Sequence, residues 1–133
     1  MFDYERERSL PTAAVTHVGV DHVRLSYHYL DVGDIDAYAS LLDERVEVRL
    51  PGAPRGRGRE EVLRLHTEVA RSADRHELSQ VIAAESNVVV IGRLVRSTAV
   101  PPDPPDVEFV DVFTVSDVGL LLGYQRFHFT AIG

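Results

Sequence analysis

One carboxylate in this sequence stands where an apolar side chain is expected. The segment VEFVDVFTV, residues 107–115, reads as a β-strand, in which side chains alternate between two faces. Asp111 then shares a face with Phe109 and Phe113. An ionised carboxylate in an apolar setting is costly unless it is paired, hydrogen-bonded or kept protonated. The position of Asp111 therefore requires a partner or a chemical role.

The next segment supplies candidate partners. The turn sequence SDVG joins this strand to LLLGYQRFHF, residues 120–129, which reads as a second strand. Pairing across that turn places Asp111 opposite Tyr124 and brings Arg126 and His128 to the same face. A carboxylate, a phenol, a guanidinium and an imidazole on one apolar face are typical of a small-molecule site. The alternative is that Asp111 and Arg126 form only a structural ion pair.

The other face of these two strands is too apolar to face water comfortably. It is expected to carry Val110, Val112, Leu121, Gln125, Phe127 and Phe129.

Helices are expected before these strands. Apolar residues recur at spacings of three and four over residues 16–30, which predicts a helix. Gly33 suits the position just past its end, and Asp34 suits the N-cap of a second short helix through about Leu42. A third helix is predicted over residues 58–73, with an apolar stripe of Val62, Leu65, Val69 and Ala73 and with His66 on the same side.

Strands make up most of the remainder. RVEVRLP, residues 45–51, alternates as a half-buried strand, and residues 76–83 and 86–98 read as long strands. The proline-rich segment 100–106 must be a connection. Helices followed by an antiparallel run of strands predict an α+β fold, in which helices cover one face of a sheet. We expect a single domain over 1–133 with a loose N-terminal arm, 1–15.

Other polar residues fit no clear site. The two arginines of the loop GAPRGRG, residues 52–58, are interpreted as solvated rather than as an anion site. Arg93 and Arg96 lie on opposite faces of their strand, so at most one points inward. Four further histidines show no converging pattern and are expected to be exposed: His17, His22, His28 and His76. No histidine pair has the spacing of a metal site, so no metal is expected.

Composition bounds the class of protein. The chain has 133 residues, 44% of them hydrophobic, and a net charge of −7, which disfavours non-specific binding to nucleic acid. It has no cysteine, which excludes disulfides and thiol catalysis. No apolar run reaches the length of roughly 20 residues that a membrane span needs. The N-terminus lacks the apolar core of a signal peptide, so a cytoplasmic protein is expected.

Three segments resemble the nuclear transport factor 2-like superfamily, which includes ketosteroid isomerases and SnoaL-like polyketide cyclases. They are YLDVGDIDAYASLLDERVEVRLPG, GRGREEVLRLH and VEFVDVFTVSDVGLLLGYQRF, and the resemblance runs from about residue 17 to 129. It implies a curved antiparallel sheet wrapped around three N-terminal helices, a cone with an apolar interior pocket. Many members pair through the convex face of the sheet, so a homodimer is expected.

The resemblance also assigns site residues. Asp111 falls where ketosteroid isomerases carry a neutral, hydrogen-bond-donating aspartic acid and where SnoaL-like cyclases carry their acid/base aspartate. Tyr124, Arg126 and His128 match pocket-facing positions of the last strand.

Departures from the family pattern narrow the chemistry. The isomerase's general base falls at Leu50, which cannot take a proton, and its oxyanion tyrosine falls at Ser26, with Tyr27 one residue away. Steroid isomerisation is therefore disfavoured. The strand GRLVRST has neither the aspartate of the epoxide-hydrolysing relatives nor the histidine of the cyclases. His128 or His66 would have to replace that histidine.

The leading hypothesis is a cofactor-free acid/base enzyme of secondary metabolism, of the type that makes polyketide antibiotics. It would cyclise, isomerise or dehydrate a small apolar carbonyl compound, with Asp111 moving the proton. Tyr124, His128 and Tyr27 would stabilise the enolate oxygen, and Arg126 would hold an acidic substituent or favour the ionised carboxylate. The expected substrate pocket comprises Tyr27, Ser26, Leu50, His66, Phe109, Phe113 and Arg126. The alternatives are a module that binds a ligand without chemistry and a dimerisation domain whose pocket is filled by its own side chains.

Overall fold

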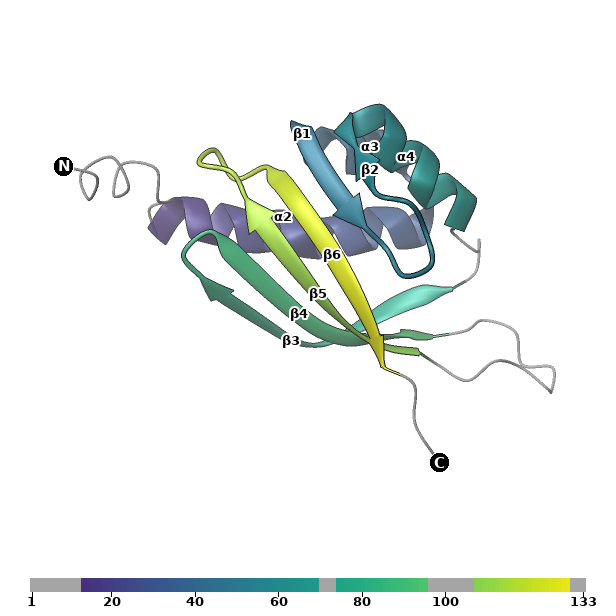
Figure 1. Ribbon diagram of the computed structural model, residues 1–133. Coiled ribbons are helices and arrows are strands. Elements are labelled where there is room, and N and C mark those ends of the chain that lie inside the picture. Colours follow the sequence, from purple (N-terminus) through teal and green to yellow (C-terminus); the bar gives the residue numbers. More distant parts are fainter. Residues whose placement is uncertain (1–12, 70–73, 96–106, 130–133) are drawn as a thin grey trace.

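The computed structural model describes residues 13–69, 74–95 and 107–129 (Figure 1). Some of the predicted features lie outside the described residues: the connection 100–106, Arg96, Ala73 and residues 1–12 of the expected arm. Helix α2, Ala13–Val32, begins three residues earlier than the predicted helix, so residues 13–15 belong to a helix and not to an arm. No helix among the described residues is long and apolar enough to cross a membrane.

The predicted roles of Gly33 and Asp34 at the boundary between the first two helices are confirmed. Gly33 adopts a φ of +76°, a conformation that favours glycine, and follows the last residue of α2. The Asp34 carboxylate then accepts a hydrogen bond of 3.1 Å from the backbone N–H of Ala37 and caps helix α3, Ile35–Ser40. Helix α3 is shorter than predicted, because the chain enters a strand at Leu42.

Six strands form one sheet. They are β1 Leu42–Arg49, β2 Gly56–Arg57, β3 Arg75–Ala84, β4 Asn87–Val95, β5 Val107–Val115 and β6 Leu121–Phe129, and helix α4, Gly58–Val69, stands between β2 and β3. Their order in the sheet is β2-β1-β6-β5-β4-β3. Strands β3 to β6 pair antiparallel as predicted, but β1 pairs in parallel with β6. The sheet is therefore mixed. A parallel pair is possible because a long stretch of chain separates its two strands.

The predicted register between β5 and β6 is wrong by two residues, while the predicted face of Asp111 is correct. Asp111 lies opposite Arg126, not Tyr124, and Tyr124 lies opposite Phe113. The predicted pairing places Val115 opposite Leu120, but Val115 pairs with Leu121, which shifts the register by one residue. The irregular pairing between Thr114 and Val115 shifts it by one more. Two single-residue shifts restore the original alternation, so the predicted face of Asp111 is kept.

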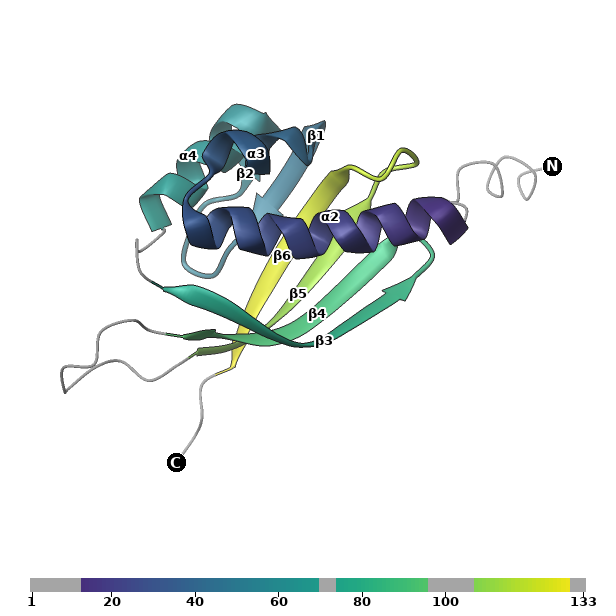
Figure 2. The ribbon, with the colours of Figure 1, turned by 180° about the vertical axis from the view of Figure 1, so that it is seen from behind.

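Helix α2 crosses one face of the sheet, while α3 and α4 gather beside β1 and β2 (Figures 1 and 2). The core fills the space between these layers. It includes Val23 and Tyr27 of α2, Val46 and Val48 of β1, and Val62 and Leu65 of α4. The predicted apolar stripes of the first helix, the first strand and the third helix therefore face the core, as far as side chains are described.

The opposite face of the sheet carries no helix among the described residues (Figure 1). On it Phe127 and Phe129 keep 45% and 53% of their surface exposed, and Val110 and Val112 are half-buried. Leu121, predicted on this face, is instead buried in the core, because the irregular pairing turns it inward.

Candidate functional site

Asp111 lies at the middle of β5 and is completely buried. Arg126, directly opposite on β6, binds it with two hydrogen bonds, from Nε to Oδ1 at 2.8 Å and from Nη2 to Oδ2 at 2.9 Å. Such a bidentate pair matches the planar guanidinium to the two carboxylate oxygens. The ion pair considered as an alternative in the sequence is therefore present in the structure.

Two tyrosines complete the surroundings of the carboxylate. The Tyr27 hydroxyl of α2 donates a hydrogen bond of 2.5 Å to Oδ2 of Asp111, and the Tyr124 hydroxyl of β6 donates one of 3.2 Å to the same oxygen. Burial, and then the nearby Asp111 carboxylate, raise the pKa of Tyr27 well above its usual value. Both carboxylate oxygens accept hydrogen bonds and neither donates one, a pattern that an ionised carboxylate satisfies.

Aromatic rings pack around this cluster. The Arg126 guanidinium carbon lies 4.1 Å from the centre of the Phe109 ring, and the rings of Phe113 and Tyr124 lie 4.6 Å apart. The Tyr27 ring meets the Phe113 ring edge-on at 5.9 Å. These contacts hold the polar groups in fixed positions and strengthen the electrostatic interactions among them by excluding water.

The two candidate positions on α2 differ in role. Tyr27 reaches Asp111, whereas the buried Ser26 hydroxyl donates a hydrogen bond of 2.6 Å to the carbonyl oxygen of Val23 in its own helix. Of these two neighbouring positions, Tyr27 is the one whose hydroxyl reaches Asp111.

His66 is buried beside the same cluster. It shares a hydrogen bond of 2.8 Å with the hydroxyl of Tyr38, and its ring centre lies 6.0 Å from that of Tyr124. Burial, and then the positive charge of Arg126, lower the pKa of His66 to about 4. His66 is therefore neutral at physiological pH. Its partner Tyr38, almost fully buried, was not singled out in the sequence.

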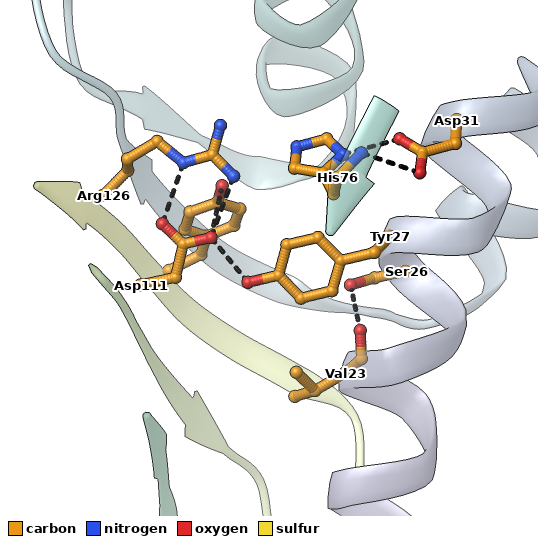
Figure 3. A network of polar contacts seen from close by, with 8 residues as sticks. Val23, Ser26, Tyr27, Asp31, His76, Asp111 and Arg126 are labelled. Carbon is orange, nitrogen blue, oxygen red and sulfur yellow. Dashed lines mark hydrogen bonds and ion pairs between the residues drawn. The ribbon is translucent and has the colours of Figure 1, made fainter. Parts of the chain in front are cut away.

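The structure contains a second polar pair that was not predicted from the sequence. His76, the second residue of β3, binds Asp31 in the last turn of α2, with 2.6 Å between Nδ1 and Oδ1 (Figure 3). The His76 ring lies 5.0 Å from the Tyr27 ring and 5.7 Å from the Phe109 ring. The expectation that His76 is exposed is wrong. A signal existed: Asp31 stands four residues after Tyr27, so both lie on one face of the helix.

The other three histidines lie away from the cluster. His17 and His28 are exposed, as expected. His22 is half-buried, contrary to expectation, and its Nδ1 lies 2.7 Å from the carbonyl oxygen of Gly119.

His128 and Leu50 belong to a groove rather than to the buried cluster. The side chain of His128 is exposed, opposite Phe109 in the pairing of β5 and β6, and Leu50 is half-buried. Together with Arg126 they line an open groove of about 450 Å³, whose other lining residues are Arg49, Pro51, Ala53, Arg55, Gln125 and Phe127. Arg126 thus connects the groove to Asp111.

The arginines of β4, of β2 and of the start of α4 bind acidic or carbonyl groups away from Asp111. Arg93 lies opposite Glu77 on the face away from the helices and donates hydrogen bonds of 3.0 and 2.9 Å to its carboxylate. The end of the predicted loop 52–58 is strand β2, because Gly56 and Arg57 pair with β1. Arg57 of β2 lies 3.1 Å from Glu47, and Arg59 of α4 donates to the carbonyl oxygen of Leu42. Within the described ranges no group of three or more histidine, aspartate or glutamate side chains could hold a metal ion.

The six-stranded sheet with helices over one face has the cone-shaped fold of the nuclear transport factor 2-like proteins. The SnoaL-like domain family matches residues 23–122, and the chain belongs to this family. No curated protein matches the chain.

Solved structures share the fold at low sequence identity. A candidate ketosteroid isomerase from Kribbella flavida DSM 17836 is 22% identical, with a TM-score of 0.73 over 89% of this chain and 82% of the other. A candidate SnoaL-like polyketide cyclase from Jannaschia sp. CCS1 is 18% identical, with a TM-score of 0.73 over 88% and 89%. An LEH-like epoxide hydrolase from M. tuberculosis is 18% identical, with a TM-score of 0.69 over 86% and 84%.

Proposed function

We propose that the protein is a cofactor-free acid/base enzyme that moves a proton to or from a carbon next to a carbonyl group. One observation carries the proposal: a fully buried carboxylate, Asp111, gathers a guanidinium and two phenol hydroxyls at the junction of α2, β5 and β6. Donors fixed in this way are suited to stabilise negative charge on an oxygen.

Tyr124 is the donor best placed to turn to a substrate. Its hydrogen bond to Asp111, at 3.2 Å, is the longest of the four. If the Tyr124 hydroxyl donates instead to a substrate carbonyl oxygen, the proton acceptor is Oδ1 of Asp111, which accepts one hydrogen bond, from Arg126, among the described residues and so has a lone pair for a proton. Asp111 could then take up the proton that leaves the neighbouring carbon, while Arg126 stabilises the enolate oxygen. In this series of steps Asp111 remains the acid/base group and Tyr124 is the oxyanion donor.

The substrate is proposed to be a small, largely apolar carbonyl compound of the polyketide type. The aromatic rings of Phe109 and Phe113 favour an apolar body, and Arg126, which binds Asp111, also lines the groove. Cyclisation, isomerisation and dehydration all begin with the same proton transfer. The names of the structural neighbours, a polyketide cyclase candidate and an isomerase candidate, agree with this class of chemistry.

We also propose that the protein is a homodimer that pairs through the face of the sheet opposite α2. This face exposes Phe127 and Phe129 and half exposes Val110 and Val112. An apolar surface of this kind is stabilised by a second copy. Light scattering of the wild type and of Phe127→Asp tests the proposal: the variant is expected to be a monomer.

A module that binds a ligand without chemistry is the second candidate. One observation favours it: Leu50 stands where the isomerases carry a base. Such a module would return every ligand unchanged.

Deuterium exchange tests the enzyme proposal. The wild type is incubated in heavy water with cyclic ketones and β-keto esters, and loss of the α-proton signal is followed by NMR. The proposal predicts exchange faster than in buffer for at least one compound. It also predicts a loss of roughly tenfold or more in Tyr124→Phe, which removes one oxyanion donor. Absence of exchange across the panel would favour the binding module.

A further inference from the structure

Asp31 and His76 form a fixed pair between α2 and β3. Besides the 2.6 Å contact with Nδ1, the Asp31 carboxylate accepts a hydrogen bond of 3.0 Å from the backbone N–H of His76. The side chains of His76 and Asp31 are only 11% and 19% exposed. Two contacts from one carboxylate fix both the position of the strand and the rotation of the imidazole ring.

This arrangement selects one tautomer of the neutral imidazole. A carboxylate next to Nδ1 favours the form in which Nδ1 carries the proton and donates it to Asp31. The lone pair is then on Nε2, at the other side of the ring. Among the residues that the structure describes, none is bonded to Nε2. In Figure 3 this nitrogen points away from Asp31, toward the side of the cluster where Arg126 lies.

Shared aromatic neighbours place His76 beside the Asp111 cluster. The His76 ring packs against the rings of Tyr27 and Phe109, and Tyr27 is the residue that donates to Asp111. Arg126 lies over the same Phe109 ring. A substrate that reaches the cluster would therefore lie within reach of a proton acceptor from β3 and of oxyanion donors from α2 and β6.

We propose that His76, oriented by Asp31, is a second proton-transfer residue of the site. The inference rests on the proposed function. For a substrate whose α-carbon faces β3, Nε2 of His76 rather than Asp111 takes the α-proton, and the electrons of the broken C–H bond form the enolate double bond. The carbonyl π electrons move to the oxygen, which Arg126 and Tyr124 stabilise. The imidazolium then returns the proton to carbon or to a leaving hydroxyl group, so that no external reactant is needed.

Asp31 is a positioning residue in this scheme. It stabilises the imidazolium that forms and keeps Nε2 as the proton acceptor, the roles that an aspartate plays beside a catalytic histidine. A pair with only a structural role would also join α2 to β3. Its tautomer would then have no effect on the exchange of substrate protons.

Nitrogen-15 NMR of the wild type without any ligand is the first arm of the test. The proposal predicts that neutral His76 carries its proton on Nδ1, and that Asp31→Asn weakens this preference. If Nε2 carries the proton in the wild type, that nitrogen cannot accept another and the inference fails. This readout does not depend on enzyme activity.

Deuterium exchange of the compound on which the wild type is most active is the second arm. His76→Gln is expected to lower the exchange rate by about 10²-fold or more, and Asp31→Asn by a smaller factor. His22→Gln is the matched control, because His22 is also half-buried and bonded to one oxygen acceptor, but it lies in the middle of α2 and contacts Gly119 in the turn between β5 and β6. It should leave the rate unchanged.

The outcomes separate the two claims. Exchange in the wild type that persists in a folded His76→Gln variant would overturn the role of His76 and leave the proposed function intact. Absence of exchange in the wild type would instead contradict the proposed function, and the tautomer measurement would then decide whether the pair is arranged for proton transfer.

Discussion

Asp111 and Arg126 stand directly opposite each other on neighbouring strands, and both carboxylate oxygens are bound by the one guanidinium. The carboxylate is fully buried and the arginine side chain is 9% exposed. Removing one partner of such a pair leaves an uncompensated charge in the core, which costs far more than the pair contributes in net stability. The ion pair thus supports the fold and also positions charge at the candidate site.

The first prediction concerns this pair. Asp111→Asn is expected to lower the free energy of unfolding by about 3–5 kcal/mol, because Arg126 loses its counter-charge in the core. Urea denaturation of the wild type and the variant measures the difference. The double variant Asp111→Asn/Arg126→Met should lose less than the sum of the two single losses. An increase in stability in Asp111→Asn would contradict the account, because it would mean that the carboxylate is strained and unpaired.

The second prediction separates the neighbours Tyr27 and Ser26. Tyr27→Phe removes a 2.5 Å hydrogen bond to a buried carboxylate and is expected to cost about 1–3 kcal/mol. Ser26→Ala removes only a bond to the Val23 carbonyl within the same helix, and alanine favours the helix, so its cost should be within about 1 kcal/mol. Equal effects of the two substitutions in chemical denaturation would contradict the assigned geometry.

The third prediction is a pH dependence due to His66. Its pKa is lowered from the usual 6.5 to about 4 in the folded protein, so the unfolded chain binds more protons between these two values. The stability due to neutral His66 is complete above the unfolded pKa and is lost as the pH falls from 6.5 toward 4.

His66→Gln supplies the comparison for this dependence. On going from about pH 7 to about pH 5, the wild type should lose about 2 kcal/mol more stability than His66→Gln. Glutamine does not titrate, so losses common to both proteins arise from other groups. Parallel losses in the two proteins, measured by urea denaturation at both pH values, would show that His66 is not buried in its neutral form.

The fourth prediction concerns the strand backbone beneath Phe109. A Cβ atom on Gly92 would collide with the carbonyl oxygen of Glu77 and would lie 3.0 Å from the Phe109 ring. Gly92→Ala is therefore expected to destabilise the protein by about 1–3 kcal/mol. Gly123→Ala is the control, because its Cβ would meet only Thr114, at 3.5 Å. Thermal unfolding of both variants compares the two sites, and a control that melts lower than Gly92→Ala would contradict the packing described here.

Much of the fold could be predicted because local signals agreed with the tertiary structure. The cap at Asp34 and the glycine at position 33 marked a real helix boundary, and period-two alternation identified β5 and β6. The register could not be predicted, because the turn and the irregular pairing near Thr114 follow from tertiary packing. The correct face was nevertheless predicted, since the two deviations cancel in the alternation.

The candidate site could be predicted only in part for a related reason. Asp111, Tyr124 and Arg126 lie on adjacent strands, so alternation alone groups them. Asp31 and His76 are 45 residues apart and meet only because α2 crosses the sheet next to the start of β3. The spacing of Tyr27 and Asp31 places both on one helix face, but no periodic pattern in a single sequence pairs that face with residue 76. The loop arginines were correctly interpreted as solvated, although Arg55 also lines the groove.

Binding of 2-naphthol, a planar mimic of an enolate, tests the central claim most directly. The free compound is protonated at neutral pH, and its absorbance and emission distinguish naphthol from naphtholate. If Arg126 and Tyr124 stabilise charge on a substrate oxygen, the wild type should bind the compound as naphtholate at about pH 7, and Tyr124→Phe should weaken that binding by roughly tenfold or more. Binding of the neutral form alone, or equal binding by both proteins, would contradict the claim that this cluster is built to stabilise an enolate.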